Sequence, residues 1–173
     1  MQLTRAADYA VRVMVHMAGL PPGTRASRVE LAEAVECPEQ FLSKVLQSLT
    51  RSGLVVSHRG NTGGFELPGQ RRAATLLEVV EAIEGHIRLN VCLTSDHSCT
   101  RQAWCPAHDV WAEAQASLVA VLQEATISEL AERAAARKAA GEVIKRYGTN
   151  RDRGAGEPGD GGGKGKSLDA TRN

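Results

Sequence analysis

The sequence predicts a mostly α-helical protein: a winged helix-turn-helix with a β-hairpin wing, followed by a long dimerisation helix. Two short amphipathic segments separated by a turn near residue 36 predict the helix-turn-helix. Two short apolar segments on either side of the glycine-rich stretch 60–64 predict the wing. Apolar residues in steps of three and four over 111–125 predict the long helix. No apolar run approaches the roughly 18 to 20 residues of a membrane span.

Residues 4–18 are expected to form the first helix. Apolar side chains recur there at helical spacing and would form one buried stripe, which comprises Leu3, Ala7, Ala10, Val11, Met14 and Met17. Pro21, Pro22 and Gly23 then interrupt the pattern, because proline lacks a backbone donor and glycine favours turns. We therefore expect a break over residues 19–25.

The predicted helix-turn-helix follows this break. Ser27 and Glu30 have the spacing of a capping box and start a short second helix that reaches Val35. Pro38 suits the first position of a third helix, which Gly53 stops. The third helix would turn one set of side chains inward, namely Phe41, Leu42, Val45, Leu46 and Leu49.

The strands of the wing are expected at 54–59 and 65–67. In this fold the second short helix enters the major groove, and the wing lies over the DNA backbone or minor groove. Double-stranded DNA is therefore the expected partner, contacted by Glu39, Gln40, Ser43, Lys44, Gln47, His58 and Arg59. The alternative is a winged helix that contacts proteins, in which Lys44 and Arg59 are ordinary solvated charges.

Charge is divided unevenly along the chain. Residues 1–72 carry a net charge of +3, residues 73–136 of −6 and residues 137–173 of +4. A basic first part suits a protein that meets phosphate at one end only. We predict a DNA-binding domain over 1–72. A second region over 73–147 is predicted to contain a cysteine-rich loop that binds a ligand and the dimerisation helices. A tail over 148–173, with almost no apolar residues, is predicted to be disordered.

Three helices are expected in the second region. Thr75 and Glu78 form a capping box for a helix that Gly85 ends. Pro106 begins the long helix, whose apolar seam comprises Trp111, Ala114, Leu118, Val121 and Ala125. Such a seam needs a partner helix, and we expect its own copy in a homodimer. Thr126 and Glu129 cap one further helix to about residue 137.

A cysteine loop lies between the first two of these helices. Cys92, Cys99, Cys105 and His108 are separated by six, five and two residues. The chain begins without the layout of a signal peptide, which predicts the reducing cytoplasm, where clustered cysteines are more often ligands than disulfides. Zinc sites usually pair ligands in two tight knuckles, so the spacing favours an iron–sulfur cluster over zinc and leaves both zinc and no metal open.

Alternative roles exist for these residues. An enzyme using Cys105 as nucleophile and His108 as base would need an orienting group and an oxyanion site, and the sequence offers neither, so we expect no enzyme. His108 is either a fourth ligand or an exposed helix residue. Cys37, which precedes an apolar helix far from the loop, is expected to be buried or capping rather than a ligand.

Several motifs together resemble a known family. They are the opening residues 1–4 with Asp8, Tyr9 and Ala10, the stretch 55–64 with its Arg-Gly and Gly-Gly pairs, and the three cysteines before a long helix. They closely resemble the Rrf2 type of bacterial transcription regulators over about residues 1–137. The resemblance implies a homodimer on a pseudo-palindromic operator, with an iron–sulfur cluster on each subunit held by Cys92, Cys99 and Cys105.

Two subtypes of this family differ in the fourth ligand. In nitric-oxide-sensing members of the NsrR type, an aspartate at the position of Asp8 from the other subunit completes a four-iron cluster. In cluster-assembly regulators of the IscR type, a histidine matching His108 completes a two-iron cluster. The opening residues and 89–92 look more like the nitric-oxide sensor, which implies a repressor that senses nitric oxide or redox stress and carries [4Fe-4S], with [2Fe-2S] as the alternative. Gln40, Ser43 and Lys44 differ from the residues that the cluster-assembly type uses, so its operator is not carried over.

Overall fold

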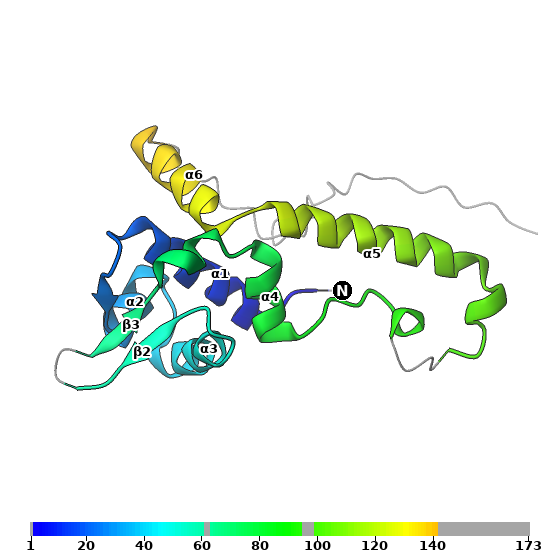
Figure 1. The fold of residues 1–173 in the computed structure, drawn as a ribbon, viewed down its shortest axis with the longest axis horizontal. Coiled ribbons are helices and arrows are strands. Elements are labelled where there is room, and N and C mark those ends of the chain that lie inside the picture. Colours follow the sequence, from blue (N-terminus) through cyan, green and yellow to red (C-terminus); the bar gives the residue numbers. More distant parts are fainter. Residues whose placement is uncertain (1, 61–62, 95–98, 142–173) are drawn as a thin grey trace, which may run out of the picture. The chain divides into compact units, whose positions relative to one another are not determined.

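The computed structural model describes residues 2–60, 63–94 and 99–141, and it is mostly helical (Figure 1). Its α-helices are α1 (Arg5–Gly19), α2 (Arg28–Ala34), α3 (Glu39–Arg51), α4 (Leu76–Glu84), α5 (Pro106–Glu124) and α6 (Ile127–Ala139). Its strands are β1 (Arg25–Ala26), β2 (Val56–His58) and β3 (Gly64–Glu66), and short 3-10 helices are η1 (Gly69–Ala73), η2 (Val91–Leu93) and η3 (Gln102–Trp104). The predicted winged helix-turn-helix and the long helix after it are confirmed.

Local sequence signals start and stop the helices as expected. Three capping boxes are formed, by Ser27 with Glu30, Thr75 with Glu78, and Thr126 with Glu129, and each satisfies two backbone N–H groups at a helix start. Gly85 ends α4 with a φ of 76°, in the region that glycine adopts without steric cost. The predicted helices therefore lie within one or two residues of the observed ones.

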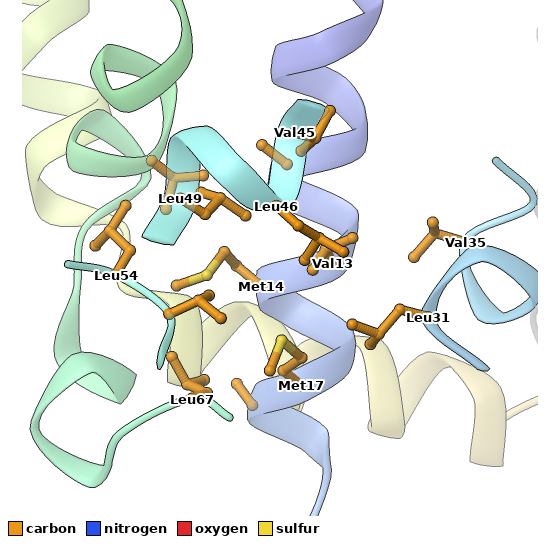
Figure 2. Packing of buried hydrophobic residues seen from close by; sticks show 14 of the residues in the cluster. Val13, Met14, Met17, Leu31, Val35, Val45, Leu46, Leu49, Leu54 and Leu67 are labelled. Atoms are coloured by element: carbon orange, nitrogen blue, oxygen red, sulfur yellow. The ribbon is translucent and has the colours of Figure 1, made fainter. Parts of the chain in front are cut away.

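The core forms where α1 packs against α3 and the start of the wing. Figure 2 shows Val13 and Met14 of α1 pointing toward Leu46 and Leu49 of α3, and these four side chains are fully buried or nearly so. Burying each such side chain contributes roughly 1.5–3 kcal/mol. The core therefore fixes the helix-turn-helix against α1.

Two residues of the predicted apolar stripes are not in the core. Leu3 is 44% exposed, because it precedes the N-cap Thr4 and so lies outside the helix whose periodicity it seemed to share. Phe41 is 39% exposed, because the buried face of α3 begins one residue later at Leu42. Its ring instead makes an edge contact with Tyr9 at 5.7 Å between centroids. Both expectations of burial were wrong.

The wing is a three-stranded antiparallel sheet in the order β1-β3-β2, of which only β2 and β3 were expected. β1 has two residues, too few for any alternating pattern, and it pairs with β3 through Ala26 and Phe65. This pairing requires glycine at 64, since a Cβ there would lie 2.8 Å from the carbonyl oxygen of Ala26. A Cβ at residue 63 would lie 2.5 Å from the carbonyl oxygen of His58, so Gly63 allows the two strands of the hairpin to approach closely.

The chain leaves the helix-turn-helix through α4 and returns to it through α6. Both helices pack on α1, and Ile127 at the start of α6 is fully buried in the same core as Met14. Two backbone hydrogen bonds join the start of α4 to the start of α6, from Leu76 N to Ala125 O at 2.8 Å and from Ile127 N to Ala74 O at 2.9 Å. α5 and the cysteine loop are therefore anchored at both ends to the helix-turn-helix core.

α5 has no buried residue, although it is the longest helix described. Leu118, Val119 and Leu122 pack on a small cluster at α4 (Leu77, Val80 and Ile87). Val110, Trp111 and Val121 are 65%, 42% and 65% exposed. The predicted seam is thus divided: Leu118 contacts its own chain, whereas Trp111 and Val121 are exposed on α5 within the described residues.

Two predictions concern the division of the chain. The disordered tail over 148–173 lies outside them, so it stays a prediction. The domain division at residue 72 also stays a prediction, and α4 and α6 share the core of the helix-turn-helix. None of the described helices has the length and apolar character that crossing a membrane requires.

Candidate nucleic-acid interface and cysteine loop

The recognition helix α3 is set against α2 by a tight turn. Glu36 adopts a φ of 52° in this turn, and the N–H of Cys37 donates to the carbonyl of Ala32 at 2.9 Å. The outward face of α3 presents three of the predicted contact residues to solvent, which are Gln40, Lys44 and Gln47. These side chains are free to reach base edges or phosphates.

Two other predicted residues of α3 already have partners in the chain. The hydroxyl of half-buried Ser43 donates to the carbonyl oxygen of Glu39 at 3.0 Å, one turn earlier. Oε1 of Glu39 accepts from Nε of Arg28 at 2.6 Å and also contacts Nη2 of the same guanidinium. Arg28 is the first residue of α2, and no sequence motif distinguishes it from other exposed cations.

On the wing, His58 is held by a carboxylate while Arg59 is exposed. Nε2 of His58 lies 2.8 Å from Oε2 of Glu66, and Nε of Arg25 lies 3.6 Å from the same oxygen. The three side chains come from three different strands, so these polar groups form a row across the sheet. Of the two predicted wing residues, only Arg59 is fully available to a phosphate or a minor groove.

An open depression of about 460 Å³ lies between the C-terminal half of α3 and the wing. Gln47, Thr50, Arg51, Ser57 and Phe65 line it. Guanidinium and hydroxyl groups are common phosphate donors in protein–DNA interfaces. Arg51 and Ser57 are thus additional candidate contacts, and only the tertiary arrangement of helix and wing identifies them.

The three cysteines of the loop are free thiols with different surroundings. Cys92 is buried in η2, whereas Cys99 and Cys105 are partly exposed. Cys105 precedes the first residue of α5, and its carbonyl accepts from the backbone N–H of His108 at 3.0 Å. A thiolate at this position would lie near the positive end of the helix dipole.

His108 lies beside the loop in the first turn of α5. Its Nε2 is 3.5 Å from the side-chain amide nitrogen of Gln102, and its Nδ1 is buried without a hydrogen-bond partner among the described residues. His108 and Cys99 line one open depression of about 490 Å³. An imidazole nitrogen without a hydrogen-bond partner, on a residue that shares a depression with a cysteine, suits a metal or cluster ligand.

The types of donor in the loop suit an iron–sulfur cluster, but the described residues of one chain do not bring them together. Within the described ranges, no three His, Cys, Asp or Glu side chains are gathered to hold a metal ion. Asp8 is on α1, where its carboxylate pairs with Arg12 of the same helix at 2.8 Å. His97, which the sequence places in the same loop as a minor ligand candidate, lies outside the described residues. The ligand assignment of Cys92, Cys99, Cys105, Asp8 and His108 therefore stays a prediction.

Cys37 is buried, as the sequence predicted, and in this it differs from Cys99 and Cys105 of the loop. Its side chain is only 7% exposed, and burial raises the pKa of its thiol. We expect iodoacetamide to alkylate Cys99 and Cys105 of cluster-free protein at least tenfold faster than Cys37 at pH 8, because the reactive species is the accessible thiolate. Peptide mass spectrometry over time measures these rates, and equal labelling of all three cysteines would contradict the assignment of Cys37 as a structural residue.

Comparison with known proteins identifies the family. The sequence profile of the Rrf2 family, described as an iron-dependent transcriptional regulator, matches residues 3–133. Protein aau3 of Rhizobium meliloti is 36% identical over 132 residues, which is 75% of this chain and 84% of that protein. A protein of Mycobacterium tuberculosis named as an HTH-type transcriptional regulator (Rv1287) is 33% identical over 131 residues, which is 76% of this chain and 81% of that protein.

Solved structures share the fold at lower identity. CymR, the global cysteine regulator of B. subtilis, has a TM-score of 0.62 and 22% identity, covering 77% of this chain and 98% of that chain. IscR of T. potens has a TM-score of 0.59 and 23% identity, covering 78% of this chain and 88% of that chain. With the winged helix, the exposed recognition helix and the family profile in agreement, the chain belongs to the Rrf2 family of DNA-binding transcriptional regulators.

Proposed function

We propose that this chain is a homodimeric, cytoplasmic repressor that carries an iron–sulfur cluster and senses nitric oxide or redox stress. The observation that carries the proposal is the loop with three free thiols, which is inserted between α4 and α5 of a DNA-binding regulator. Cys92, Cys99 and Cys105 would hold the cluster, [4Fe-4S] in preference to [2Fe-2S]. When bound, such a cluster supplies an iron with an exchangeable non-cysteine ligand, open to nitric oxide or oxygen.

The anchoring of the loop supports a regulatory role. η2, which contains Cys92, contacts α5, and α5 packs on α4. α4 in turn packs on α1 and α3 in the helix-turn-helix core. A displacement of the cysteine loop would therefore act on α4 and α5 before it reached the recognition helix. A transmission route of this kind becomes allosteric control if the loop has two states with different DNA affinity.

A second candidate is a regulator of the IscR type, with His108 as the fourth ligand. The buried, unpaired Nδ1 of His108 and the depression that His108 shares with Cys99 favour this candidate. Asp8 is engaged by Arg12 within its own helix, and in the first candidate it would have to serve the cluster of the partner subunit. A regulator with zinc or no metal is a third possibility, and visible absorbance of anaerobically purified protein separates it, because zinc proteins are colourless.

DNA binding itself is tested at Lys44 and Arg59, the exposed cations of the recognition helix and the wing. Replacing either by Ala should weaken operator binding by about 1–3 kcal/mol if it contacts a base, or lower the salt slope by about one if it contacts a phosphate. Fluorescence anisotropy at several salt concentrations measures both quantities, with duplexes selected by the parent protein from a randomised library.

Arg133→Ala is the matched control, since Arg133 is an exposed cation on α6, away from α3 and the wing. It should change neither affinity nor salt slope. If Lys44→Ala and Arg59→Ala both behave like this control, the proposed docking of α3 and the wing on DNA is wrong.

A further inference from the structure

We infer that Arg28 and Glu39 form a base-reading pair, in which Glu39 accepts a hydrogen bond from a cytosine amino group and Arg28 is the positioning residue. The inference rests on the proposed DNA-binding function. It adds a specific base for one residue and a role for another that lies outside the recognition helix.

The position of the pair points to the major groove. Arg28 is the first residue of α2, and Glu39 is the first residue of α3. In helix-turn-helix proteins the N-terminal residues of the second helix contact base edges. Both side chains remain about half exposed, at 51% for Arg28 and 42% for Glu39, so a DNA groove can still reach the carboxylate.

The hydrogen bonds of the pair leave one oxygen for the DNA. Nε and Nη2 of Arg28 both contact Oε1 of Glu39. Across the described part of the chain, no hydrogen bond or ion pair to Oε2 is found, and an ionised carboxylate can only accept. Cytosine offers an amino donor in the major groove, whereas adenine places the N7 acceptor beside its donor and guanine and thymine offer acceptors. An acceptor-only side chain therefore selects cytosine.

Arg28 also reduces the electrostatic repulsion between Glu39 and the DNA phosphates. A lone carboxylate that enters the groove is repelled by the phosphates on both sides, and this repulsion weakens binding to every sequence. The guanidinium cancels that charge without blocking Oε2. It also restricts the rotamers of Glu39, so less conformational entropy is lost when the carboxylate meets a base.

Selection from a randomised duplex library tests the pair, using full-length parent protein in cluster-loaded and cluster-free form. The parent should enrich cytosine at one position of each half-site, and changing that cytosine to thymine should weaken binding about tenfold. Glu39→Gln should move the preference to adenine, which glutamine reads through N6 and N7. Arg28→Met should reduce the cytosine preference while leaving the rest of the selected sequence unchanged.

Glu33→Gln is the matched control, because Glu33 is an exposed carboxylate of α2 and its loss changes the net charge equally. It should select the parent sequence, and melting temperatures verify that all variants fold. If Glu39→Gln also selects the parent sequence, or binds all sequences uniformly more weakly, the pair only joins α2 to α3 and the inference is overturned. Failure of the parent to enrich any duplex would instead overturn DNA binding itself, and the inference with it.

Discussion

Replacement of any one of Cys92, Cys99 and Cys105 by Ala is expected to abolish retention of an iron–sulfur cluster, whereas Cys37→Ala retains it. The three thiols belong to one loop beside α5, while Cys37 is buried in the turn of the helix-turn-helix. Each thiolate would hold one iron of such a cluster, so a variant that lacks one of them would bind the cluster more weakly. Iron and sulfide analysis with visible absorbance, after anaerobic purification, measures retention.

The same measurement assigns the fourth ligand. If Asp8 completes a four-iron cluster, Asp8→Ala should alter the absorbance spectrum or the response to nitric oxide, while His108→Ala changes little. The opposite pattern identifies His108 and the IscR type. Arg12→Ala is a useful control, because it removes the ion pair of Asp8 without removing the carboxylate. A full cluster in any of the three loop-cysteine variants would refute the role of that cysteine.

Val121→Glu is expected to convert a homodimer into monomers that bind DNA poorly. Val121 is 65% exposed on α5 and belongs to the predicted seam, so in a two-fold symmetric dimer the substitution would bury two charges there. Burying an unpaired charge costs several kcal/mol, which exceeds the contribution of most individual apolar contacts. Light scattering at micromolar concentration measures the oligomeric state, and anisotropy measures DNA affinity.

The choice of Val121 follows from the structure. The sequence alone favours Leu118→Glu, because Leu118 is central in the seam, but Leu118 also packs on the cluster at α4 and its replacement would disturb the monomer. Gln123→Glu adds the same charge at an exposed polar position of α5 and should leave the dimer intact. A monomeric parent protein, or a dimeric Val121→Glu variant, would remove the proposed role of α5.

The sequence predicted features that depend on local chemistry. Three capping boxes, the stop at Gly85 and the start at Pro106 each involve residues within one turn of each other, so no tertiary information was needed. The same holds for the glycines of the wing, although the reason for Gly64 emerged only with β1. That two-residue strand forms because it pairs with β3, and two residues are too few to show the alternating pattern that predicts a strand.

Contacts between distant segments were not predictable. The partners of Glu39 and His58 are Arg28 and Glu66, which surface charge alone does not distinguish from other exposed residues. Phe41 illustrates a smaller error, since the apolar stripe of α3 starts one position later than the sequence suggested. The spacing of the cysteines predicts metal or cluster ligands, and this stays a prediction, whereas the spacing does not distinguish Asp8 from His108 as the fourth ligand.

The most direct test of the proposed function compares DNA affinity with and without the cluster. Full-length protein is purified anaerobically and titrated by anisotropy against the duplex that it selects, before and after cluster removal, at one fixed salt concentration. Affinity should differ by about tenfold or more, within the usual range of allosteric coupling. Nitric oxide should move the loaded protein to the affinity of the cluster-free form. Equal affinity of both forms, or a colourless protein without iron, would contradict control of DNA binding by the cysteine loop.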